Sequence, residues 1–205
     1  MESTVTLTGE HVKSYCDYMF HRFDAKLVKK EGNTFMDMAG KLIGMDEETW
    51  QKYTTTIGHT IYSNTVPGVF TEGHSLVGQI CLFTHELKHV CQADDEFLYS
   101  MKYLTSKSYR TKKEVEAYTA NMEMYHILTG KMLSINSIIN NLHDYKITVT
   151  DLNVAEIELE QANKIISYGG IINEISVIGK SYLETIIPGY PKTLLRPEVN
   201  HSMLL

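Results

Sequence analysis

The sequence predicts an α+β fold that is mostly helical, with a small β-sheet or hairpin. Only four prolines occur and three of them follow residue 187, so long helices can run through the body of the chain. Apolar residues recur at helical spacing along most of the sequence, whereas residues 54–62 form one segment rich in β-forming residues. We expect one compact domain over residues 1–205, with N-terminal helices in residues 1–52 and C-terminal helices in residues 130–205.

The individual elements follow from apolar spacing and from end signals. The spacing predicts helices over residues 10–30, 35–43, 75–92, 96–104, 112–128, 132–142 and 151–167. Asp46 is the expected N-cap of a further short helix that carries Trp50. One or two strands are expected over residues 54–62, before a turn at Pro67-Gly68, and an extended tail from Pro188 onward.

Composition excludes several classes of function. The chain of 205 residues carries 19 basic and 25 acidic residues, and its net charge of −6 argues against nucleic acid as a partner. No apolar run approaches the length of a membrane span, and the polar N-terminus lacks a secretory signal, so we expect a cytoplasmic protein without a membrane partner. The three cysteines, Cys16, Cys81 and Cys91, have no CxxC spacing and are expected to be reduced thiols.

The chemistry is concentrated in the segment His85-Glu86-Leu87-Lys88-His89. On a helix, His-Glu-x-x-His places two imidazoles one turn apart on the same face, where both can bind one tetrahedral Zn²⁺ ion. Glu86 lies between them and is the candidate general base, able to take a proton from a water and deliver it to a leaving amine. Residues 53–129 are therefore the expected strand and metal-site core.

The helix around this motif is predicted to be buried on nearly all sides. An apolar stripe runs along its back, and the run immediately before the motif, residues 80–83, is also apolar. The stripe consists of Leu76, Ile80, Phe83, Leu87 and Val90, and Cys91 lies toward the same side. Two histidines and a glutamate at the end of a buried helix need a partner, and a metal ion is the best one.

A third protein ligand is expected downstream, where Glu114 and Glu116 are the two candidates. They are two residues apart, so about 200° of helix rotation separates them and only one can face the motif. Glu114 shares its helix face with aromatic residues such as Tyr118 and Tyr125. Glu116 lies on another face, with Lys112 and Glu123, and the charged residues there predict a solvent-exposed surface. The periodicity therefore predicts His85, His89 and Glu114 as the metal ligands, with Glu116 on the surface.

With these residues in place, the chain resembles the gluzincin-type zinc metallopeptidases, in which a Glu from a later helix completes His-Glu-x-x-His. Their Glu-x-x-Ala pattern is matched by residues 114–117, and the context is similar to small bacterial and phage-encoded zincin domains. The matching segments are residues 56–62, 85–92 and 109–118, about a third of the chain. Tyr118 departs from the pattern, since many relatives carry there an Asp that steadies a metal ligand. The resemblance implies a zincin-like fold and hydrolysis of peptide bonds in a peptide or protein substrate.

Several assignments stay open. Tyr109 or Tyr118 is expected to stabilise the oxyanion, with Tyr109 the better candidate. In zincins an edge strand binds the extended substrate, and residues 57–62 either take this role or form a plain structural strand around His59. The alternative function is a structural or interaction protein, for example a phage-associated component, in which His59 or His74 closes the zinc site as a fourth ligand. The sequence does not determine the oligomeric state.

Overall fold

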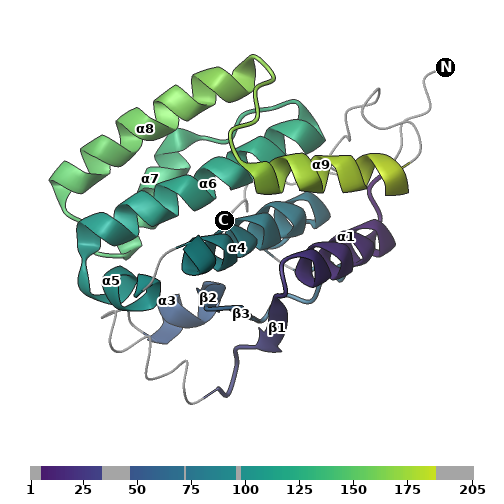
Figure 1. The fold of residues 1–205 in the computed structure, drawn as a ribbon, viewed down its shortest axis with the longest axis horizontal. Coiled ribbons are helices and arrows are strands. Elements are labelled where there is room, and N and C mark those ends of the chain that lie inside the picture. Colours follow the sequence, from purple (N-terminus) through teal and green to yellow (C-terminus); the bar gives the residue numbers. More distant parts are fainter. Residues whose placement is uncertain (1–5, 34–46, 72, 96–97, 188–205) are drawn as a thin grey trace.

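The computed structural model describes residues 6–33, 47–71, 73–95 and 98–187, and most of them are helical (Figure 1). Along the chain the elements are α1 (Gly9–Arg22), β1 (Lys26–Lys29), α3 (Glu47–Lys52), β2 (Thr55–Ile57), β3 (Thr60–Ser63), α4 (Leu76–Asp95), α5 (Tyr99–Thr105), α6 (Lys107–Thr129), α7 (Ile135–Asp144), α8 (Val149–Ser167) and α9 (Glu174–Ile186). This arrangement confirms the predicted α+β, mostly helical class with a small sheet.

The three strands form one mixed sheet in the order β1-β3-β2. β1 runs parallel to β3, with Lys26 opposite Thr60, and β2 runs antiparallel to β3. The prediction of a helix through residue 30 was therefore wrong. The first helix ends at Arg22 because Asp24 takes a left-handed φ of 49° and the Ala25 amide bonds back to the Phe20 carbonyl at 2.8 Å. The chain then leaves the helix axis and pairs with β3.

Helix α4, which carries the His-Glu-x-x-His motif, lies between the sheet and the other helices (Figure 1). It packs against α6 on one side, against α1 and α9 on another, and against β2 and β3 of the sheet. The predicted stripe along its back is in the core, since Ile80, Phe83, Leu87 and Val90 are fully buried. This burial on several sides explains why the residues around the motif are apolar on more than one face.

Helix α6 separates two groups of buried apolar residues and contributes to both. Ala120, Met124 and Leu128 pack with residues of α1 and α4, whereas Val115 and Met122 pack with α7 and α8. A helix with apolar partners on opposite sides shows little amphipathic contrast, so its faces are hard to assign from sequence.

The solvated stripe expected on α6 was wrong at Glu123. This side chain is fully buried and accepts hydrogen bonds from the backbone amides of Ile172 and Asn173, at the start of α9. Helix α9 was not predicted at all. Its Gly179 allows close packing on α1, because a Cβ there would lie 2.6 Å from the Tyr15 hydroxyl.

The remaining boundaries differ from the predictions by a few residues. Helix α6 begins five residues early, at Lys107, because the Ser106 side chain caps it by accepting from the Tyr109 amide. The predicted helix at residues 35–43, the Asp46 cap and the tail from Pro188 lie outside the described residues. None of the described helices is both long and apolar enough to cross a membrane.

Candidate metal centre

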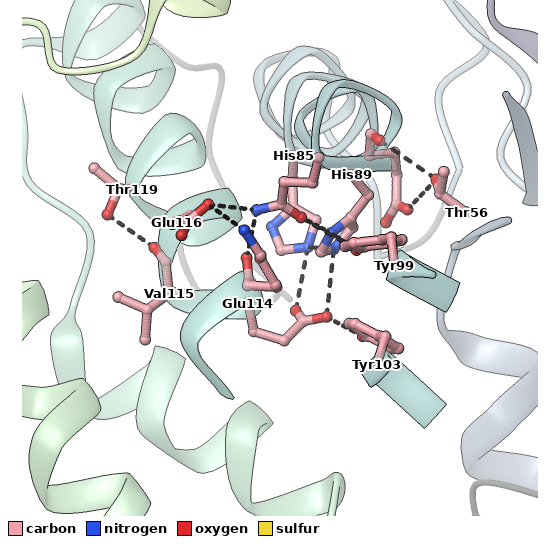
Figure 2. A network of polar contacts seen from close by, with 12 residues as sticks. Thr56, His85, His89, Tyr99, Tyr103, Glu114, Val115, Glu116 and Thr119 are labelled. Atoms are coloured by element: carbon pink, nitrogen blue, oxygen red, sulfur yellow. Dashed lines mark hydrogen bonds and ion pairs between the residues drawn. The ribbon is translucent and has the colours of Figure 1, made fainter. Parts of the chain in front are cut away.

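Two buried imidazoles meet on one face of α4. His85 and His89 are one helical turn apart, and their Nε2 atoms lie 3.2 Å from each other (Figure 2). Their rings are inclined at 81°, and each residue is less than a tenth exposed. The spacing of the motif therefore has the consequence expected from helix geometry, with two nitrogens directed at one point.

Helix α6 brings Glu114 to the same point. Its Oε2 lies 3.4 Å from Nε2 of His85, and its Oε1 lies 3.3 Å from Nε2 of His89. Donor atoms bound to one tetrahedral zinc ion at about 2.0–2.1 Å are about 3.3 Å apart, and each carboxylate oxygen of Glu114 lies at about this distance from one of the two histidine nitrogens. The three residues form a group that could hold a metal ion, and no further His, Cys, Asp or Glu of the described chain joins it.

The polar atoms of this group are incompletely satisfied by the protein. Oε2 of Glu114 and Nδ1 of His85 are both buried without a hydrogen-bond partner among the described residues. A buried carboxylate oxygen without a partner is costly, and a bound cation would remove that cost for Glu114. The donor set of two imidazoles and one carboxylate also suits zinc. The residues present therefore fit a metal ion of the kind that the sequence predicted.

Two members of the group, Glu114 and His89, have strongly shifted pKa values. Burial acts to raise the pKa of Glu114, but the adjacent His89 and His85 outweigh it and hold the pKa well below its usual range. Burial likewise acts to lower the pKa of His89, yet the carboxylate of Glu114 dominates and raises it to about 9. The site thus stabilises positive charge next to Glu114, as a cation-binding site should.

The short helix α5 supports the metal ligands through two tyrosines one turn apart. The Tyr99 hydroxyl lies 3.1 Å from Nδ1 of His89, and the Tyr103 hydroxyl donates a short hydrogen bond to Oε1 of Glu114 (Figure 2). Buried Arg110 of α6 holds the end of α5 by donating to the carbonyls of Tyr103 and Leu104, each at 2.9 Å. Helix α5 is therefore fixed both to α6 and to the candidate ligands.

Glu86, the candidate base, points away from this tyrosine pair and toward the sheet. Its Oε2 accepts a hydrogen bond of 2.7 Å from the hydroxyl of Thr56 in β2, and the side chain is almost completely buried. His85 and Glu86 line a cavity of about 710 Å³, which is bounded mainly by α4, α6, α7 and the segments that flank the sheet. The cavity reaches the motif from the side on which Glu86 lies, so a ligand in it can meet both residues.

Some of the other predicted site residues lie at the candidate metal centre or its cavity, and others lie away from it. Tyr118 lies at the site, with its ring 4.6 Å from that of His85. Tyr109 packs behind Tyr99, and the hydroxyl that contacts Glu114 belongs to Tyr103 instead. His59 is on the surface, where its Nε2 pairs with Asp94 at 2.8 Å. His74 lines the cavity, and burial lowers its pKa.

Two further predictions are refined by the structure. Glu116 was placed on the surface, and its side chain is 33% exposed and pairs with Lys113 at 3.6 Å. Its carboxylate also accepts a hydrogen bond of 3.0 Å from Gln92 of α4, beside the candidate metal ligands, which the helix periodicity did not predict. For residues 57–62 the sequence left two alternatives, a substrate-binding edge strand or a plain structural strand. The segment spans the end of β2 and most of β3; β3 is the central strand, and β2 is the strand at the edge on the side of the motif. Helix α6 is close enough to α4 for both glutamates to contact it, a proximity that rotation angles alone do not reveal.

Sequence reasoning missed four residues at the site: Thr56, Gln92, Tyr99 and Tyr103. Gln92 follows His89 by three residues, and on a helix this spacing places the two side chains next to each other. The sequence alone could therefore have identified Gln92 as a neighbour of the ligand. Tyr99 and Tyr103 are one turn apart on α5, but nothing in their spacing indicates which helix they face. Thr56 reaches Glu86 only because the sheet packs on α4.

Comparison with models of known protein families, with curated proteins and with solved structures gave no match to this chain.

Proposed function

We propose that this protein is a zinc-dependent metallopeptidase that hydrolyses peptide bonds. One observation carries the proposal: ligand atoms of His85, His89 and Glu114 converge within 4.8 Å of one another, with a buried carboxylate of Glu86 on the adjacent cavity. This is the combination that metal-assisted hydrolysis needs, namely an ion site and a base within reach of the same substrate.

Each side chain of the site has its own role in the proposed reaction. His85, His89 and Glu114 would hold the ion, which when bound supplies Lewis acidity and lowers the pKa of a water to about 7. Glu86 accepts the proton of the attacking water and then delivers it to the leaving amine. Thr56 orients the Glu86 carboxylate through its hydrogen bond to Oε2. The buried surroundings strengthen each of these electrostatic contacts.

An extended peptide is the substrate class that the surroundings support. In the described sheet β2 is an edge strand and carries Thr56, so a peptide added to this edge would pass close to Glu86. The cavity of about 710 Å³ is large enough for one or two side chains of such a peptide.

The alternative, a structural zinc protein, requires a fourth protein ligand that closes the site. His59 is engaged with Asp94, and the described residues supply no fourth ligand atom to the group. The lack of a fourth ligand among the described residues, His74 included, supports the catalytic proposal.

The test is peptide profiling of the purified protein loaded with zinc, with Glu86→Gln beside the parent. The amide keeps the size of the side chain but cannot accept a proton, so hydrolysis should fall by at least about 100-fold while zinc content stays the same. Glu158→Gln, on the exposed face of α8, is the matched control and should behave as the parent. Equal cleavage by Glu86→Gln and the parent would contradict the assignment of the base, and zinc bound without any cleavage would favour the structural alternative.

A further inference from the structure

We propose that Gln92, held in place by Glu116, is a positioning residue of the metal centre, which keeps the proton of the His89 imidazole on Nδ1 and leaves Nε2 free to bind the metal. The inference rests on the metal-binding part of the proposed function and does not depend on peptide hydrolysis.

The orientation of the Gln92 amide is set on the side away from His89. Its Nε2 donates to the carbonyl of Lys113 and to Oε2 of Glu116, each at 3.0 Å. A carbonyl and a carboxylate can only accept hydrogen bonds, so the NH₂ group of Gln92 has to face them. Gln92 is 2% exposed, and a flipped amide would place its oxygen against both of these acceptors in a buried position.

The orientation of the Gln92 amide determines which of its two polar atoms faces the His89 ring. Oε1 of Gln92 lies 2.8 Å from Nδ1 of His89 and also accepts from the Tyr99 hydroxyl at 3.1 Å. An amide oxygen cannot donate, so the contact with His89 is a hydrogen bond only when Nδ1 carries the proton. A neutral imidazole has one N–H, and Nε2 then keeps the lone pair that a metal requires.

The arrangement links the two helices that form the site. Helix α6 supplies Glu114 to the ligand group, and, beside it, Glu116 and the Lys113 carbonyl to Gln92. Helix α4 supplies His89 and, three residues later, Gln92. The network of contacts is visible in Figure 2, where Glu116 lies to the left of the histidines and Thr56 to their right. Glu116 thus acts on His89 without touching it, through the orientation of one amide.

The experiment measures zinc affinity by competition with a chromogenic chelator, for the folded parent and its variants. Gln92→Ala should weaken zinc binding by about 10–100-fold, as is typical for partners that orient a metal-binding histidine. Glu116→Ala should weaken it less, on the order of a few-fold, because Lys113 still holds the amide. Gln79→Ala is the matched control. Gln79 is a fully buried glutamine of the same helix, but it bonds to the loop backbone at Gly68 and Val69, so its loss should leave the affinity of the folded protein unchanged.

Two readouts separate positioning from a general loss of structure. In the zinc-loaded parent, the ¹⁵N shifts of His89 should identify Nε2 as the bound nitrogen and Nδ1 as protonated, with slow exchange of that proton. In a double-mutant cycle, Glu116→Ala should have no further effect once Gln92 is Ala, because it acts only through that amide. Binding through Nδ1, unchanged affinity in Gln92→Ala, or additive losses in the cycle would each overturn the proposal. All of these measurements concern zinc binding, so they stand whether or not the protein cleaves peptides.

Discussion

The hydroxyl of Thr56 donates to Oε2 of Glu86 at 2.7 Å, so the edge strand β2 is tied directly to the candidate base on α4. Two parts of the chain 30 residues apart meet in this contact. A hydrogen bond to a charged group is worth about 1.5–3 kcal/mol, which is enough to decide how the carboxylate is oriented.

Replacing Thr56 should therefore lower the rate of the proposed hydrolysis. Thr56→Val keeps the shape but loses the donor, and we expect kcat to fall by about 10-fold or more, with little change in KM. Thr56→Ser keeps the hydroxyl and should retain most of the activity. Thr54→Val is the matched control, because that hydroxyl pairs with Ser63 and not with Glu86. A Thr56→Val variant as active as the parent would show that Glu86 needs no support from β2.

Glu114 and Glu116 should differ sharply in their effect on zinc retention. Glu114→Ala removes one of the three donors and the only carboxylate in the ligand group, so zinc should be lost to a chelator that the parent resists. Glu116→Ala removes a hydrogen-bond acceptor of Gln92 and an ion pair with Lys113, but no atom of the ligand group, so most of the affinity should remain. Titration of both variants with the same chelator measures the difference. The reverse order would reassign the third ligand.

Removal of the metal should lower the stability of the fold. An ion that binds only the folded chain stabilises it by about 2.7 kcal/mol at 100 times its Kd, so a strong chelator should shift the thermal midpoint down by several degrees. His85→Ala and His89→Ala should show low midpoints that no longer respond to the chelator. A parent midpoint that is the same with and without chelator would mean that no stabilising ion is bound.

Lys30 provides a stability prediction away from the metal. Its buried ammonium group donates to the carbonyls of Trp50 at 2.5 Å and Tyr53 at 2.6 Å, and to the Thr55 hydroxyl at 3.0 Å. Lys30→Met leaves these acceptors without their donor, and we expect a loss of about 2–5 kcal/mol in the free energy of unfolding. Lys29→Met is the control, since Lys29 is exposed and its ion pair among the described residues is with exposed Glu31, and it should cost about 0–1 kcal/mol.

The pH dependence of that loss has a definite sign. Burial lowers the pKa of Lys30 to about 8, below the value of about 10.4 expected in the unfolded chain. Between these values the unfolded state binds the extra proton, so the contribution of Lys30 to stability rises as the pH rises from 8 to about 10. Denaturant unfolding at pH 7 and pH 10 should therefore give a larger difference between parent and Lys30→Met at pH 10. A smaller difference at pH 10 would contradict the depressed pKa.

Local spacing accounts for the part of the site that the sequence could predict. His85 and His89 converge because four residues make one helical turn, and Glu114 was identified because its face of the helix is aromatic. The mostly helical class and the strands at residues 54–62 likewise depend on the spacing of apolar residues and on local residue preferences, both of which can be seen in the amino-acid sequence. These parts need no knowledge of how distant segments pack.

Tertiary packing alone decided the rest. Glu116 and Glu123 have the spacing of solvated residues, yet Glu116 bonds to Gln92, and Glu123 is buried at the start of α9. Tyr103 reaches Glu114 because α5 packs against α6, where Arg110 donates to the carbonyls of Tyr103 and Leu104. The physical reason is common to all of these residues. A polar side chain is buried when a segment far along the chain offers it a partner, and periodicity describes one element at a time, so it contains no information about that partner.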